Sequence, residues 1–190
     1  MEHRFAQEVL LDAIPDIEQD PLPGLLSRMQ AVERLQRLVE SANRWGVEHV
    51  LCYVDLEDFR RVNADGGRGA GDTILNEIGV WLRQRIRPGD RVARMGSDEF
   101  AILMEDAPLL EGIRFGRSTR QGLARRSFRH GMGDFSVAAS IGLVPIFRGC
   151  SDAADILAAA DAACRQAQEV YPSGLRVATA RAPGETRLLI

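Results

Sequence analysis

Segments with helical and strand-like spacing of apolar residues follow one another along the chain. Residues 25–45, 72–86 and 155–168 carry apolar side chains every three or four positions, which predicts three amphipathic helices. A weaker helical pattern covers residues 107–128, where glycines interrupt it. Apolar runs of strand length cover residues 50–54, 91–95, 100–104, 135–144 and 175–178. This order predicts an α/β (α+β) domain with a central mixed five-stranded sheet flanked by helices.

The two ends of the chain depart from this layered pattern. Residues 1–19 are expected to form an N-terminal linker or helix, because Pro15 interrupts a short helical spacing. The chain breakers at residues 20–24 mark the start of a domain that we expect to cover residues 20–180. Residues 181–190 are expected to form a C-terminal tail or linker.

Composition limits the classes of function. Of 190 residues, 45% are apolar and 27% charged, which suits one domain with a sizeable core. A net charge of −3 argues against nucleic-acid binding, and no apolar run approaches the ~18–20 residues that cross a bilayer. All 24 basic residues are arginine, which excludes lysine-dependent P-loop or Schiff-base chemistry within this chain. Three scattered cysteines predict a cytoplasmic location.

Two carboxylates lie beside predicted turns. Asp55 follows a buried strand, and Asp98 lies in the turn between two strands. In a mixed sheet these positions can be neighbours, and two carboxylates brought together repel unless a cation lies between them. Oxygen ligands favour Mg²⁺, which takes its other ligands from water and substrate phosphates. The alternative is that Asp98 only stabilises a turn and that Asp55 only ends a strand.

Several segments together resemble the GGDEF domain of bacterial diguanylate cyclases. The family signature has its counterpart in Gly96-Ser97-Asp98-Glu99-Phe100, a GSDEF variant. The other similar segments cover residues 20–28, 55–63, 71–72, 140–142 and 160–163. The likeness follows the family's order and separations, and it implies a fold similar to the polymerase palm and the nucleotidyl cyclase core.

The resemblance implies a cyclic di-GMP signalling domain that condenses two GTP molecules and releases pyrophosphate. Asp55 and Asp98, with the carbonyl of Leu56, would hold Mg²⁺ or Mn²⁺, and Glu99 would act beside the metal and the reacting hydroxyl. The resemblance implies that Asn63 and Asp72 bind the guanine. It implies that backbone N–H groups near Phe59 and Arg60 bind the β- and γ-phosphates. The nucleotide would approach the backbone closely at Gly96 and Ser97. Catalysis would require a homodimer in which two GTP-loaded domains face each other.

Some positions depart from the family pattern. Ser97 replaces the second signature glycine, and its hydroxymethyl group would crowd the nucleotide. Gln168 and Pro172 stand where the family commonly has the lysine and arginine that grip the triphosphate, which implies reduced turnover. An arginine would have to supply that charge, and Arg165 and Arg176 are candidates. The other departures are Glu57, Ala64 and Arg68.

A second motif predicts feedback by the product. Residues 87–90 resemble the family's R-x-x-D inhibitory site, in which Arg87 would bind a phosphate or guanine edge of cyclic di-GMP and Asp90 the base. The alternative is a Pro-Gly turn flanked by solvated charges.

Two other functions stay open. In one, a degenerate GGDEF module binds GTP or cyclic di-GMP and regulates an attached partner, such as a sensor or an EAL phosphodiesterase domain, without catalysis. In the other, the fold is a dimerisation or docking surface. Asp72 would then be only a helix N-cap and Asn63 only a turn residue.

Overall fold

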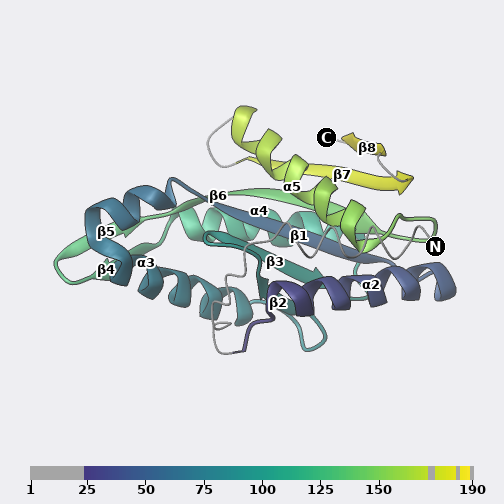
Figure 1. The fold of residues 1–190 in the computed structure, drawn as a ribbon, viewed down its shortest axis with the longest axis horizontal. Coiled ribbons are helices and arrows are strands. Elements are labelled where there is room, and N and C mark those ends of the chain that lie inside the picture. Colours follow the sequence, from purple (N-terminus) through teal and green to yellow (C-terminus); the bar gives the residue numbers. More distant parts are fainter. Residues whose placement is uncertain (1–23, 171–173, 183–184, 189–190) are drawn as a thin grey trace, which may run out of the picture.

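The computed structural model describes residues 24–170, 174–182 and 185–188, so the helix expected within residues 1–19 and the position of Pro172 lie outside the described residues. Each helix is followed along the chain by one or more strands (Figure 1). The elements are α2 (Arg28–Trp45), β1 (His49–Glu57), α3 (Phe59–Arg83), β2 (Arg91–Arg94), β3 (Glu99–Met104), α4 (Leu109–Ala124), β4 (Ser127–His130), β5 (Gly133–Ser136), β6 (Ala138–Ile146), α5 (Ala153–Val170), β7 (Leu175–Ala182) and β8 (Glu185–Leu188).

One mixed sheet forms the centre of the molecule, with the strand order β2-β3-β1-β6-β7-β8. β1 pairs antiparallel with β3 and β6, whereas β6 and β7 run parallel. The five predicted strands are confirmed as a mixed sheet, and β8 adds a sixth strand antiparallel to β7. β8 and the last two residues of β7 belong to the segment that was expected to form a tail.

The central strand β1 separates two apolar cores. Val50, Cys52 and Val54 pack with buried residues of α3 and α4. Leu51 and Tyr53 face the other way and pack with buried residues of α2 and α5. Since both faces of β1 are covered, its sequence is a continuous apolar run, and Asp55 is the first carboxylate where that run ends.

Helix α2 illustrates how local sequence sets the ends of an element. The Ser27 side chain accepts a hydrogen bond from the Gln30 backbone N–H, and the Gln30 side chain accepts one from the Ser27 N–H, which is a capping box. Gly46 ends the helix in the left-handed conformation at φ 72°, which glycine adopts without strain.

The start of α3 differs from the sequence-based expectation. The helix begins at Phe59, ahead of the glycine-rich stretch, and only Gly67 (φ 79°, ψ 169°) interrupts it. The prediction that Asp72 caps a helix N-terminus is therefore wrong, because Asp72 lies inside α3. Burial of Val62 before the glycines and of Ile74 after them in the apolar core compensates for the low helix propensity of the glycines.

The strand predicted over residues 135–144 is divided in two. β5 ends at Ser136 and pairs with β4 in a separate two-stranded hairpin, whereas β6 joins the main sheet. Within the described residues, no helix combines the length and the apolar character needed to cross a membrane.

Candidate active site

The structure brings Asp55 and Asp98 together at the end of β1. In the β1–β3 pairing Asp55 lies opposite Glu99, and the Leu56 N–H donates to the carbonyl oxygen of Asp98 at 3.0 Å. The β2–β3 turn is therefore anchored directly on the backbone of β1. Residues more than forty positions apart in sequence thus form one cluster of carboxyl groups at the edge of the buried strand.

Two arginines hold the β2–β3 turn in shape. Arg94 donates from Nε to the carbonyl of Gly96 and from Nη2 to that of Ser97, both at 3.1 Å. Arg28, at the start of α2, donates to the carbonyl of Met95 at 3.0 Å. These contacts fix the backbone that carries Asp98, and sequence reasoning did not assign either arginine to the site.

Gly96 and Ser97, the first two residues of the GSDEF signature, differ in the room that the structure leaves for a side chain. A Cβ on Gly96 would lie 2.4 Å from Glu99 Oε2, so only glycine fits there while the Glu99 side chain keeps its position. Ser97 is accommodated, because its hydroxyl donates to Asp98 Oδ1 at 2.5 Å. The hydroxymethyl group predicted to crowd the nucleotide therefore also orients one of the paired carboxylates.

Two carboxyl groups of the cluster, Asp55 and Glu99, resist ionisation. Burial raises the pKa of Asp55 to about 6, Asp98, Glu99 and Asp161 add to the rise through their charge, and the hydrogen bond from Gln168 opposes it. The pKa of Glu99 is raised mainly by burial, against a hydrogen bond from the Tyr53 hydroxyl. A divalent cation would reverse this preference, since it favours the ionised carboxylates.

Helix α5 closes one side of the cluster. Gln168 Nε2 donates to Asp55 Oδ2 at 2.9 Å. Arg165 forms an ion pair with Asp161 at 2.6 Å, one turn earlier on the same helix. The sequence identified Gln168 only as a departure from the family pattern and Asp161 only as part of a similar segment, because neither role is visible without the packing of α5 against β1.

The predicted guanine contacts lie on α3. A Cβ on Gly71 would lie 2.0 Å from Asn63 Oδ1, which shows that the Asn63 amide packs over Gly71, beside Asp72. Both polar side chains are exposed, and the charges of Asp72 and Asp98 both act on the half-buried guanidinium of Arg94. Asn63 and Asp72 are therefore close to each other, and Asp72 is close to the turn that carries Asp98.

Phe59 and Arg60 are the first two residues of α3, directly after β1. The Phe59 side chain is buried in the core and that of Arg60 is exposed. The backbone N–H groups of a first helical turn have no carbonyl partner within the helix and project from its N-terminal end. This position therefore suits an anion. The contact predicted for this segment uses its backbone, which the burial of Phe59 leaves unaffected.

The predicted inhibitory motif forms a tight structural turn. Asp90 is only 4% exposed, and its two oxygens accept hydrogen bonds from the backbone N–H groups of Glu105 (3.0 Å) and Arg87 (3.2 Å). The Arg87 guanidinium is half exposed and pairs with Glu111 at 3.1 Å. Asp90 thus stabilises the turn, whereas Arg87 is the member that faces solvent.

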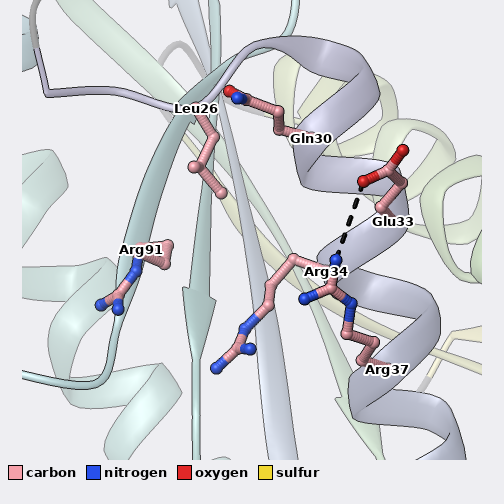
Figure 2. A pocket seen from close by; sticks show the side chains of 6 residues that line it. All are labelled: Leu26, Gln30, Glu33, Arg34, Arg37 and Arg91. Carbon is pink, nitrogen blue, oxygen red and sulfur yellow. Dashed lines mark ion pairs between the residues drawn. The ribbon is translucent and has the colours of Figure 1, made fainter.

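A pocket of about 290 Å³ lies between α2 and β2 (Figure 2). None of the predicted site residues lines it. Arg37 pairs with Glu33 at 3.7 Å on its wall, and Arg34 reaches out of it to Glu105. The lining residues are Leu26, Gln30, Glu33, Arg34, Arg37 and Arg91.

The donor set at the end of β1 fits a partly protein-held divalent cation. Within the part of the chain that the structure describes, no three His, Cys, Asp or Glu side chains form a complete metal site. Asp55 and Asp98 offer two carboxylates, to which the Leu56 carbonyl would add a third oxygen. Such a set suits Mg²⁺, which is commonly bound by one or two carboxylates and completed by water and substrate phosphates.

A helix-covered mixed sheet with paired carboxylates beside its central strand defines a palm-like nucleotidyl cyclase domain. The family model described as diguanylate cyclase, GGDEF domain, matches residues 17–171, and the chain belongs to this family.

Relatives and solved structures agree with this assignment. Diguanylate cyclase DgcP of Pseudomonas aeruginosa is 33% identical over 159 residues, which cover 84% of this chain and 24% of that protein. The response regulator PleD of Caulobacter vibrioides is 30% identical over 126 residues, 65% of this chain and 28% of that protein. The chain thus spans about a quarter of the length of either relative. The diguanylate cyclase SiaD of Pseudomonas aeruginosa, crystallised with its activator SiaC, has a TM-score of 0.78 at 27% identity, covering 93% of this chain and 67% of that one.

Proposed function

We propose that this chain is the catalytic domain of a diguanylate cyclase, which converts two GTP molecules into one cyclic di-GMP and two pyrophosphates. The observation that carries the proposal is the direct attachment of the Asp98 turn to β1 beside Asp55, in a chain of the GGDEF family. The half-buried carboxyl groups of Asp55 and Glu99 support it, because such a cluster is stable only with a cation or protons.

Each site residue has a role in this proposal. Asp55, Asp98 and the Leu56 carbonyl hold Mg²⁺ or Mn²⁺, which when bound activates the 3′-hydroxyl of one GTP toward the α-phosphate of the other. Glu99 stands beside the reacting hydroxyl. The guanine is bound by Asn63 and Asp72, the phosphates by the backbone near Phe59 and Arg60, and Gly96 and Ser97 line the approach of the nucleotide.

Each domain presents one GTP, so synthesis requires a face-to-face homodimer. An attached sensor or EAL domain and a cytoplasmic location stay predictions. We further propose that Arg87 binds a phosphate of the product, because its guanidinium is half exposed and its fork suits phosphate oxygens. Asp90 then contributes by holding the turn that carries Arg87.

A turnover assay tests the proposal. The chain at high concentration is incubated with GTP and Mg²⁺ or Mn²⁺, and cyclic di-GMP and pyrophosphate are quantified. Asp98→Asn is expected to lower the rate about 100-fold, and Asp134→Asn, in the separate β4–β5 hairpin, serves as the charge-matched control. Equal rates in wild type and Asp98→Asn contradict the site assignment.

The degenerate-module alternative gives a different result in the same experiment. The departures at Ser97 and Gln168 favour it, since both side chains now bond the paired carboxylates themselves. In that case calorimetry detects binding of GTP or cyclic di-GMP while no product forms. If neither nucleotide binds, only the docking-surface function is left.

A further inference from the structure

One face of α5 lies along the acidic end of β1. Cys164 Sγ contacts the carbonyl oxygens of Ser140 (3.1 Å) and Tyr53 (3.9 Å), and one turn later Gln168 reaches Asp55. At about 100° per residue, Asp161, Arg165 and Gln168 fall within roughly 60° of one another around the helix. These three side chains therefore form a stripe beside the carboxylate cluster.

This stripe borders a strongly negative region. Asp55, Asp98 and Glu99 belong to the cluster, and Asp161 adds a fourth carboxylate at its rim. A nucleoside triphosphate brings further negative charge, which one divalent cation does not fully balance. Binding a triphosphate here requires a protein cation that can reach it.

Arg28, Arg94 and Arg165 each contact the cluster or its turn, and they differ in how they are held, whereas the exposed Arg60 lies at the start of α3. Arg28 and Arg94 donate to backbone carbonyls of the β2–β3 turn and so serve its shape. Arg165 is held by the Asp161 carboxylate, and its side chain is 62% exposed. Its guanidinium can leave Asp161 for another anion without disturbing the turn.

We propose that Arg165 is the specificity-determining residue that recognises the β- and γ-phosphates of the nucleotide, exchanging Asp161 for phosphate oxygens when GTP binds. The inference rests on the proposed function, because it names the triphosphate contact of that same site. The ion pair joins Arg165 Nη1 to Asp161 Oδ2 alone, and a guanidinium fork can bind phosphate bidentately, so the exchange replaces this contact without a net loss.

Calorimetric titration of the whole chain with GTP and with GMP, in Ca²⁺ to limit turnover, tests the proposal. Arg165→Gln is expected to weaken GTP binding about three- to tenfold and to leave GMP binding unchanged, since GMP lacks the β- and γ-phosphates. Arg37→Gln is the matched control, because Arg37 forms an i,i+4 ion pair with Glu33 and is 64% exposed. Asp161→Asn is expected to strengthen GTP binding more in the wild-type background than in Arg165→Gln, because loss of the Asp161 charge favours the triphosphate by itself and also frees Arg165.

The outcomes separate this inference from the proposed function. If Arg165→Gln binds GTP as tightly as the wild type, or loses GTP and GMP equally, Arg165 does not recognise the triphosphate. If Arg176→Gln alone shows the GTP-specific loss, the role belongs to Arg176 and the inference is overturned. A wild-type chain that binds neither nucleotide overturns the proposed function as well.

Discussion

The side-chain amide of Gln168 donates a hydrogen bond of 2.9 Å to Asp55 Oδ2, across 113 residues of the chain. The contact joins α5 to the end of β1, at a position where the GGDEF family commonly has a lysine. An amide orients the carboxylate without adding a positive charge that would compete with a metal cation. Gln168 thus acts on the carboxylate that we propose as a metal ligand, and it supplies no positive charge to a triphosphate.

Replacement of Gln168 tests this relationship. Gln168→Leu is expected to weaken divalent-dependent GTP binding about three- to tenfold, because the half-buried Asp55 loses a charge-assisted hydrogen bond. That bond opposes the rise in the pKa of Asp55, so its loss raises the pKa further above about 6, and the weakening is larger at pH 6 than at pH 8. Gln166→Leu, on the same helix, is the control, and equal affinities of the two variants at both pH values would refute the role.

Asn63 is expected to govern base selection. Its amide packs over Gly71 beside Asp72, and a polar site built for guanine rejects a base that leaves its groups unpaired. Asn63→Ala is expected to lower the preference for GTP over ATP about tenfold or more in competition binding. Asn76→Ala, another exposed position of α3, should leave this ratio unchanged. An Asn63→Ala variant that still prefers GTP as strongly as the wild type would remove Asn63 from the base pocket.

The two members of the R-x-x-D motif are expected to respond differently to substitution. Asp90→Asn replaces an oxygen that accepts a backbone hydrogen bond with a donor, so it should lower the free energy of unfolding by about 1–3 kcal/mol. Arg87→Ala removes the ion pairs that the half-exposed guanidinium makes with the exposed Glu111 and the buried Asp90, so it should cost about 1 kcal/mol, and it should weaken cyclic di-GMP binding. Denaturant unfolding and calorimetry measure the two effects. Unchanged cyclic di-GMP affinity in Arg87→Ala would leave the motif with a structural role alone.

A glycine contact determines how closely α5 packs on the sheet. A Cβ on Gly142 in β6 would lie 2.1 Å from the carbonyl oxygen of Ala160 and 3.0 Å from the Cys164 nitrogen. Gly142→Ala is therefore expected to lower the free energy of unfolding by about 3 kcal/mol. Gly69→Ala is the control, because a Cβ there meets nothing within 4 Å and alanine favours the helix by about 1 kcal/mol at most. Similar stabilities of the two variants in chemical denaturation would mean that α5 shifts to make room.

His49 is expected to make stability depend on pH. The side chain is 4% exposed and its Nδ1 accepts the Asp106 N–H at 3.0 Å. Burial lowers the pKa of His49 from 6.5, Arg34 acts in the same direction, and Glu105 and Asp106 oppose it. Since the unfolded chain then binds the proton more tightly, the contribution of His49 to the free energy of unfolding falls as the pH drops below 6.5, whereas the raised pKa values of Asp55 and Glu99 contribute in the opposite direction.

Substitution isolates this contribution. His49→Gln keeps an acceptor for the Asp106 N–H without a titrating group, so the loss of stability between pH 7 and pH 5 should be smaller than in the wild type. Denaturant unfolding at both pH values measures the difference, and His130→Gln serves as the control. If His49→Gln and the wild type lose equal stability on acidification, the imidazole does not contribute to it.

Sequence periodicity predicted the layered fold because burial imposes a pattern on the chain. β1 is covered on both faces and is therefore a continuous apolar run, and the hairpin of β2 and β3 is two such runs around a polar turn. The same reasoning misplaced the start of α3, since four glycines among residues 66–71 argue against a helix. Gly67 does interrupt α3, but Val62 and Ile74 on either side of it are held in the core. Propensity is local, and here tertiary packing overrides it.

The sequence by itself determined the class of fold and the GGDEF membership, and it predicted the acidic residues of the candidate site, because these depend on residue types in a fixed order. Only the tertiary structure decided what each polar group bonds: Gln168 with Asp55, Ser97 with Asp98, and Asp90 with the backbone of its own turn. The physical reason is that hydrogen bonds act within about 3 Å, a distance set by how α5 and the β2–β3 turn pack on β1 and not by separation along the chain.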